Sequence, residues 1–122
     1  MLLKDFYSIE SSSQEEADYS TTIRINKDHQ IYSGHFPQRP VTPGVILMQL
    51  FKEVLERITN HELQLENATN VKFTAVVDPN LDDIIILQHN FEEDGERITL
   101  KGLAENNKVT AIKISAVYKI LK

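Results

Sequence analysis

The chain of 122 residues contains no cysteine. This absence excludes disulfide bonds, thiolate metal sites and cysteine nucleophiles, so any catalysis has to use other side chains. Long apolar runs are also missing, and none approaches the roughly 18 residues of a membrane-spanning helix. The first residues, MLLKDFYSIESSSQEE, lack the apolar stretch of a signal peptide and become acidic where a cleavage site would lie. We therefore expect a cytoplasmic protein with no membrane span.

Clusters of basic residues are missing too, because the 13 Lys and Arg residues are scattered among 18 Asp and Glu residues. Nucleic-acid phosphates need clustered positive charge, so the formal net charge of -5 argues against a nucleic-acid partner. An acidic protein partner is compatible with the sequence only through a local basic patch. No His, Asp and Glu spacing is typical of a zinc or calcium site, and nothing in the sequence calls for a metal or a cofactor.

The length suits one domain, which we expect to cover residues 1–122. Alternating apolar and polar residues predict a strand at 18–26, and the polar patch 11–16 before it predicts a turn. Similar patterns predict further strands at 2–9, 69–77, 83–91, 97–104 and 109–120. Short turn sequences separate the last three strands, which indicates a meander.

One helix is predicted at about residues 44–59, where apolar residues recur every three or four positions. Thr42 is the predicted cap, and Pro43 suits the start of the helix. The first turn, 45–48, is apolar on every side, so we expect the helix to begin deep in the protein and to surface toward its C-terminus. Its exposed face is predicted to carry Lys52, Glu53, Glu56 and Arg57. A single helix among runs of strands indicates an α+β fold, an antiparallel sheet with the helix on one face.

Proline and glycine are scarce, with four of each, yet three prolines and two glycines lie within 34–44. Each proline fixes a φ angle and restricts the residue before it, so the loop that starts at His35 is stiff before anything binds. The loop ends at Gly44, where free helix N–H groups can meet a ligand carbonyl. A base beside such an N–H can remove a proton α to a thioester. The alternative is that the prolines only shape a tight crossover and His35 bonds locally.

The other histidines, His29, His61 and His89, are expected to be partly exposed surface residues.

Residues 34–45, GHFPQRPVTPGV, resemble the active-site signature of the 3-hydroxyacyl-acyl-carrier-protein dehydratases of type II fatty acid synthesis. Eleven consecutive positions match, including all three prolines and both glycines. Residues 71–79, VKFTAVVDP, resemble more weakly the strand that follows the helix in that family. The resemblance implies a hotdog fold, in which a curved antiparallel sheet wraps one central helix, and a role in fatty-acid or related polyene or lipid biosynthesis.

The resemblance also implies roles for single residues. His35 would take the C2 proton of a 3-hydroxyacyl thioester, with its ring oriented by the carbonyl of Val41. The N–H of Gly44 would polarise the thioester carbonyl. The remaining substrate contacts would come from Phe36, Val41, Pro43, Val45, Met48 and Phe73, and Ile46 would join Val45, Met48 and Phe73 along an acyl tunnel. The thioester would be carried on acyl carrier protein or coenzyme A, and two protomers would pair edge to edge with each site at their interface.

The sequence departs from the family at the helix position fourteen residues after the histidine, where the family has Glu or Asp and this chain has Gln49. A glutamine can hold a hydroxyl or a water but has no proton to donate at neutral pH. The nearest carboxylate on the helix, Glu53, lies one turn further, about 6 Å along the axis. Glu53 is either a displaced acid or a solvated residue of the polar helix face.

Three functions fit these residues. The first is a hydro-lyase with His35 as base and Gln49 positioning the hydroxyl. The second is a weakened hotdog subunit that binds acyl thioesters or completes a heteromeric dehydratase by lending His35 to a partner's carboxylate. The third is an acyl thioesterase, in which a glutamine would position water; the proline-rich histidine loop argues against it. A homodimer or higher homo-oligomer suits the first function and a heterodimer the second.

Overall fold

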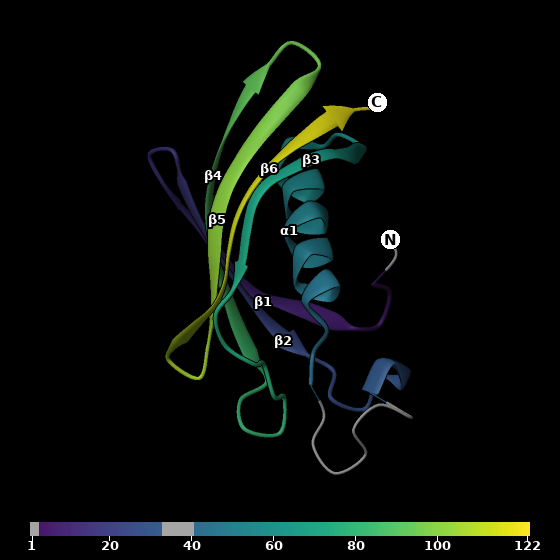
Figure 1. Cartoon of the computed structure of the whole chain (residues 1–122), viewed down its shortest axis with the longest axis vertical. Coiled ribbons are helices and arrows are strands. Elements are labelled where there is room, and N and C mark those ends of the chain that lie inside the picture. The colour runs from purple at the N-terminus through teal and green to yellow at the C-terminus, as the bar shows by residue number, and fades with distance from the viewer. Residues whose placement is uncertain (1–2, 33–40) are drawn as a thin grey trace.

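The computed structural model describes residues 3–32 and 41–122. Its elements are β1 (Tyr7–Glu15), β2 (Asp18–Ile25), a short 3-10 helix (Gln30–Tyr32), α1 (Gly44–Thr59), β3 (Leu63–Phe73), β4 (Ile84–Asp94), β5 (Arg97–Asn106) and β6 (Val109–Ile120). The strands form one antiparallel sheet in the order β1-β2-β4-β5-β6-β3. The sheet curves around α1 (Figure 1), which confirms the predicted α+β arrangement and the meander β4-β5-β6.

The core lies between α1 and the face of the sheet that the helix covers. Alternate strand residues such as Ile23, Ile85 and Leu100 are completely buried there, as are Leu50 and Leu55 of the helix. Irregular register in β1, β3 and β6 adds bends to the sheet, because an extra residue on one strand increases the local twist. The curvature lets one short helix serve the whole concave face.

The N-terminal part differs from the prediction of a strand at 2–9 and a turn at 11–16. Strand β1 begins at Tyr7 and continues through the serines, pairing with β2 up to Glu15 opposite Asp18. The turn is delayed to Glu16, which has a φ of 57°. The serine run was misassigned because an exposed edge strand lacks the apolar alternation by which strands are recognised. The residues before β1 instead insert Leu3 and Phe6 into the core.

The bounds of α1 are close to those predicted, but its start is built differently. Pro43 occupies the cap position without a side-chain hydrogen bond to the helix. The Thr42 hydroxyl, predicted as the cap, pairs with the Tyr32 hydroxyl at 2.8 Å. Asn60 ends the helix in the left-handed region that asparagine tolerates. Within residues 3–32 and 41–122, no helix is long and apolar enough to cross a bilayer.

The predicted burial along α1 is wrong in direction. Val45 in the first turn is 69% exposed, whereas Val54 and Leu55 in the second half are almost fully buried. The C-terminal half packs on the sheet, and the first turn lies where β3 ends. The apolar residues of a helical turn indicate that the turn is buried. They do not show whether residues of the same chain or of another molecule bury it.

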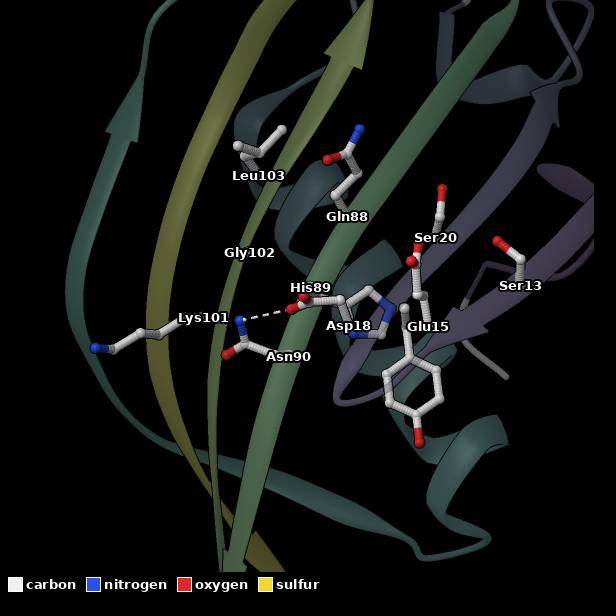
Figure 2. Close-up of a pocket in the computed structure, with 11 residues that line it drawn as sticks. Ser13, Glu15, Asp18, Ser20, Gln88, His89, Asn90, Lys101, Gly102 and Leu103 are labelled. Atoms are coloured by element: carbon white, nitrogen blue, oxygen red, sulfur yellow. Dashed lines mark hydrogen bonds between the residues drawn. The ribbon is translucent and has the colours of Figure 1, made fainter.

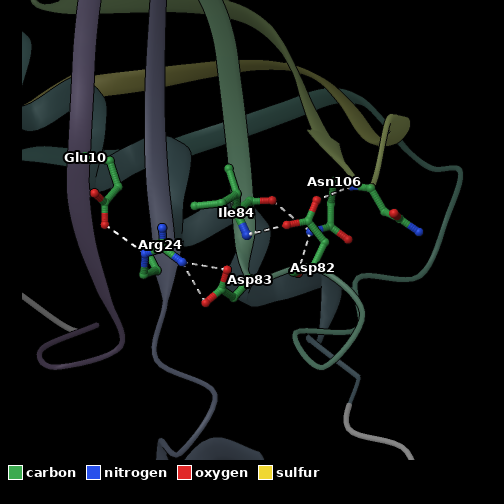
Figure 3. Close-up of polar contacts among 7 residues, drawn as sticks. Glu10, Arg24, Asp82, Asp83, Ile84 and Asn106 are labelled. Atoms are coloured by element: carbon green, nitrogen blue, oxygen red, sulfur yellow. Dashed lines mark hydrogen bonds and ion pairs between the residues drawn. The ribbon is translucent and has the colours of Figure 1, made fainter.

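Polar side chains join neighbouring strands at the start of β4 (Figure 3). Arg24 on β2 pairs with Glu10 on β1 at 3.0 Å and with Asp83 before β4 at 2.9 Å. The buried amide of Asn106 donates to the backbone oxygens of Asp82 and Ile84. The exposed ion pairs contribute little stability, whereas the Asn106 bonds satisfy two partly buried carbonyls at the point where β4 begins.

Candidate functional site

The structure describes only some of the residues of the predicted site. His35 and Phe36 lie outside them, so their predicted roles are untested. The chain is described again from Val41, which is half-buried, and Pro43 is exposed. The Thr42 N–H donates to the Val77 carbonyl at 3.0 Å, which ties the end of the loop to the segment after β3.

A small apolar hollow, called here the helix-entry hollow, lies at the first turn of α1. It encloses about 340 Å³ and is lined by Val41, Thr42, Gly44, Val45, Leu47, Phe73, Ala75 and Val76. Three of these side chains, Val45, Phe73 and Val76, are more than half exposed. Of the predicted tunnel residues, Val45 and Phe73 line the hollow. Ile46 and Met48 are half-buried and pack against the core instead.

The aromatic ring of Phe73 closely approaches Gly44. A Cβ added to Gly44 would lie 2.6 Å from Cε1 of Phe73, closer than real contacts allow. The ring of Phe73 therefore occupies the space that a side chain at position 44 would fill.

We expect Gly44→Ala to destabilise the protein by about 1 kcal/mol, because displacing the Phe73 ring outweighs the helix propensity gained with alanine. Urea unfolding of the variant measures this effect. In a Phe73→Ala background the same substitution is expected to stabilise, since the clash is gone. Equal effects of Gly44→Ala in both backgrounds would show that the two residues are not coupled.

Gln49 and Glu53 touch each other on α1. The Gln49 side-chain nitrogen donates to Oε2 of Glu53 at 3.0 Å. Glu53 is only 1% exposed, so its assignment to a solvated helix face is wrong, whereas Lys52 and Glu56 are half-buried and Arg57 is exposed.

The partners of Glu53 explain how a charged group is tolerated in this position. The Leu3 N–H donates to Oε2 at 3.0 Å and the Tyr7 hydroxyl donates to Oε1 at 3.1 Å. Together with Gln49, three donors therefore meet one carboxyl group. Burial, with the charge of Glu53 as the second cause, raises the pKa of Tyr7 to about 12, so the phenol stays protonated and remains a donor. Helical spacing pointed to the Gln49–Glu53 contact, but nothing in the sequence pointed to Leu3 or Tyr7.

A larger hollow of about 620 Å³ lies over strands β1, β2, β4 and β5 (Figure 2). Its side chains are mainly polar, among them Ser20, Gln88 and Lys101, and Asn90 donates to Asp18 at 3.3 Å across it. It lacks the apolar lining expected for an acyl group, and so the helix-entry hollow fits that ligand better. Among the described residues, no three His, Asp or Glu side chains are grouped so that they could hold a metal ion.

His89 was predicted as a surface residue, but it is 4% exposed and faces the helix. Its ring stacks on Tyr19, with centroids 5.7 Å apart, and meets the edge of Phe51 at 6.3 Å. Neither ring nitrogen has a hydrogen-bond partner among the described residues. Burial lowers the pKa of His89 from 6.5 to about 4. Because histidine is a polar residue, the alternating pattern of β4 did not indicate that His89 lies in the core.

We expect this buried histidine to make stability depend on pH. Its folded pKa lies below its unfolded pKa, so the unfolded state binds the proton more readily. The stabilisation is complete above about pH 6.5 and is lost as the pH falls toward 4, with a total of roughly 3 kcal/mol at most. Urea unfolding at pH 7.5, 5.5 and 4.5 measures it, with His89→Leu as the control. Parallel pH profiles for the two proteins would contradict the assignment.

Comparison with known proteins identifies the family. A model of the ApeI-like family, described as ApeI dehydratase, matches residues 10–113. The chain belongs to the ApeI-like dehydratase family. The 3-hydroxyacyl-(acyl carrier protein) dehydratase FabZ of Wolbachia pipientis is 33% identical over 91 residues, which are 63% of this chain and 60% of the relative. FabZ of Burkholderia mallei is 30% identical over 78 residues, 56% of this chain and 49% of the relative. The chain thus spans about half to three fifths of the length of these relatives.

Solved structures show that the ApeI-like chain has the expected hotdog fold. The structure titled the dehydratase heterocomplex ApeI:P from Xenorhabdus doucetiae matches with a TM-score of 0.74 at 17% identity, over 92% of this chain and 96% of that one. PaaI from the Escherichia coli phenylacetic acid degradation operon matches with a TM-score of 0.65 at 14% identity, over 99% and 84%. A hypothetical thioesterase with coenzyme A from Streptococcus pneumoniae matches with 0.65 at 11% identity, over 93% and 84%. At these identities the likeness concerns the fold alone.

Proposed function

We propose that this ApeI-like protein removes water from 3-hydroxyacyl thioesters to give 2-enoyl thioesters. The observation that carries the proposal is the joint presence of a dehydratase family match and the proline-rich sequence that leads from His35 to the N-terminus of α1 at Gly44. The acyl group is held as a thioester on acyl carrier protein or coenzyme A. The products are water and a conjugated enoyl thioester, and the likeness to FabZ supports a place for the reaction in fatty-acid or related lipid synthesis.

In this mechanism His35 takes the C2 proton while the N–H of Gly44 donates a hydrogen bond to the thioester oxygen. The hydrogen bond stabilises the negative charge that develops on that oxygen as C2 loses its proton. The hydroxyl at C3 then has to leave with a proton, which Gln49 cannot supply. The protonated His35 ring carries the proton that was removed from C2, and it returns this proton to the leaving oxygen. Atoms and charge balance without a second acid.

The surface around the helix-entry hollow suits an acyl chain and a second protomer. Val45, Phe73 and Val76 expose apolar side chains there, and β3 is an edge strand of the sheet. We assign this edge to pairing between two copies, because unpaired strand N–H and C=O groups next to exposed apolar side chains are stabilised by a partner strand. Pairing would complete the cover of the first turn of α1.

The second candidate function is that of one subunit in a heteromeric dehydratase. Gln49 favours it, since the chain has no carboxylate at the position where the family carries its acid. The structure of the ApeI:P heterocomplex shows that a dehydratase of this fold occurs with two kinds of chain. In that case His35 acts together with a carboxylate of the partner.

Spectroscopy of the purified protein with a 3-hydroxyacyl thioester and the matching 2-enoyl thioester tests the proposal. We expect the absorbance of the conjugated enoyl group to appear from the first substrate and to disappear with the second, without release of free thiol. Release of thiol would identify a thioesterase and overturn the proposal. Absence of both signals from the protein alone would leave the heteromeric function in its place.

A further inference from the structure

The buried carboxyl group of Glu53 has no role in the reaction described above. It lies 1% exposed on α1, one turn beyond Gln49. Its two oxygens receive hydrogen bonds from three groups on separate parts of the chain, the Leu3 N–H, the Tyr7 hydroxyl and the Gln49 amide. Burying a charged group is costly unless it is hydrogen-bonded in this way. We therefore looked for a function of the buried carboxyl group.

The carboxylate determines which way the amide of Gln49 faces. A carboxylate only accepts hydrogen bonds, so the amide group that meets Glu53 has to be the nitrogen. The amide is planar, and its oxygen is therefore directed away from Glu53. One N–H is used by Glu53, while the oxygen of Gln49 has no partner among the described residues. That oxygen can accept a hydrogen bond.

We propose that Glu53 is a positioning residue that orients Gln49 so that its amide oxygen accepts the hydrogen bond of the substrate's 3-hydroxyl. The segment that leads into β1 belongs to this arrangement, since the Leu3 N–H shares Oε2 with Gln49 and the Tyr7 hydroxyl donates to Oε1. The role of Gln49 toward substrate rests on the proposed function, whereas its orientation rests only on the hydrogen bonds that Glu53 receives.

The same contacts argue against Glu53 as the displaced acid. Leu3 N–H and the Gln49 nitrogen can only donate, and both meet Oε2 at 3.0 Å. A proton on Oε2 would be placed against these donors. A proton on Oε1 would require the Tyr7 hydroxyl to turn and accept. The ionised form satisfies all three partners as they stand, so Glu53 acts as an acceptor and not as a source of protons.

Two substitutions separate these roles. Glu53→Gln removes the acid but keeps the network, because its oxygen can accept from Leu3 and Gln49 while its nitrogen donates to the Tyr7 oxygen. We expect its kcat/KM to stay within about threefold of the wild type. Glu53→Leu removes every acceptor, and we expect kcat/KM to fall about tenfold or more. A loss of a hundredfold or more in Glu53→Gln would show that Glu53 donates a proton and would overturn the proposal.

Binding measurements make the test independent of turnover. In a His35→Ala background we compare the Kd of a 3-hydroxyacyl thioester with that of the saturated acyl thioester of the same length. We expect the hydroxyl to strengthen binding about tenfold, and this preference to persist with Glu53→Gln and to vanish with Glu53→Leu. Equal weakening of both ligands would indicate a purely structural role and contradict the proposal.

The NMR signals of the Gln49 side-chain NH2, assigned with Gln49→Ala, cover the case in which the wild type proves inactive. We expect at least one of the two proton signals to be shifted away from its free-amide position in the wild type and in Glu53→Gln, and both to return toward the free-amide positions once the anchor is removed. If Glu53→Leu does not fold, Tyr7→Phe supplies a milder variant with one donor fewer, and we expect the hydroxyl preference to fall about threefold. Unchanged Gln49 signals in a folded Glu53→Leu protein would refute the orientation by Glu53, whatever reaction the protein catalyses.

Discussion

Replacing His35 with alanine is expected to lower kcat/KM for the dehydration by ~10²–10⁴-fold, the usual contribution of general acid–base catalysis. The effect should lie near the upper end of this range. In the mechanism proposed, one imidazole both removes the C2 proton and protonates the leaving hydroxyl, so its loss affects both steps. Enoyl absorbance measured at saturating and at low substrate concentration gives kcat and KM separately.

His61→Ala is the matched control for this substitution. His61 lies after the end of α1, with its ring 3.5 Å from Glu93, and it belongs to no part of the candidate site. We expect its rate to equal that of the wild type. The account of the loop would be wrong if His35→Ala kept more than a tenth of the activity while remaining folded.

Gln49→Glu is expected to raise kcat by up to ~10²-fold, because it returns a general acid to the helix position where the family carries one. The new carboxyl group would lie against Glu53, in place of an amide nitrogen that is now 3.0 Å from Oε2. Two adjacent carboxyl groups do not both ionise readily, so the pair retains one proton and one of its pKa values is raised. That proton becomes available to the leaving hydroxyl.

The sign of the pH effect follows from the raised pKa. The folded Gln49→Glu variant holds a proton that the unfolded chain has lost above about pH 4.3. Its stability therefore declines as the pH rises from about 4.3 through the raised pKa of the pair, and its rate declines over the upper part of the same range. Stopped assays and urea unfolding at pH 5, 6.5 and 8 measure both.

The exchanged variant Gln49→Glu with Glu53→Gln is the control. The amide at 53 can then donate to the carboxylate at 49, so we expect the pH-dependent loss of stability to disappear. A Gln49→Glu rate equal to that of the wild type would contradict the view that the missing acid limits catalysis. Activity in Gln49→Glu but none in the wild type would favour the heteromeric function.

Much of the architecture was predictable from local pattern. The stop at Asn60 and the entry at Pro43 and Gly44 bounded α1, and alternation located β2, β5 and β6. The serine-rich β1 could not be recognised, because an edge strand with both faces exposed carries no apolar signal. The direction in which α1 is buried was also wrong, since an apolar first turn does not say which surface covers it.

Less of the candidate site could be predicted. The helix-entry position of Gly44 followed from the sequence, but its contact with Phe73 did not, because the two residues meet only after the sheet has curved. Glu53 was assigned to a polar face from its charged neighbours. Its true environment depends on Leu3 and Tyr7, which are 50 and 46 residues away along the chain. Pairings over such separations are set by tertiary packing, which helical periodicity does not report.

The most direct test of the central claim is isotope incorporation from labelled water. The wild-type protein is incubated with a 3-hydroxyacyl thioester in D₂O enriched in ¹⁸O, and the acyl products are examined by mass spectrometry. Reversible dehydration predicts deuterium at C2 and ¹⁸O at C3 of the recovered 3-hydroxyacyl thioester, and neither label with His35→Ala. An ¹⁸O label in a free carboxylate, or no label at all, would contradict the assignment of this chain as a dehydratase that depends on His35.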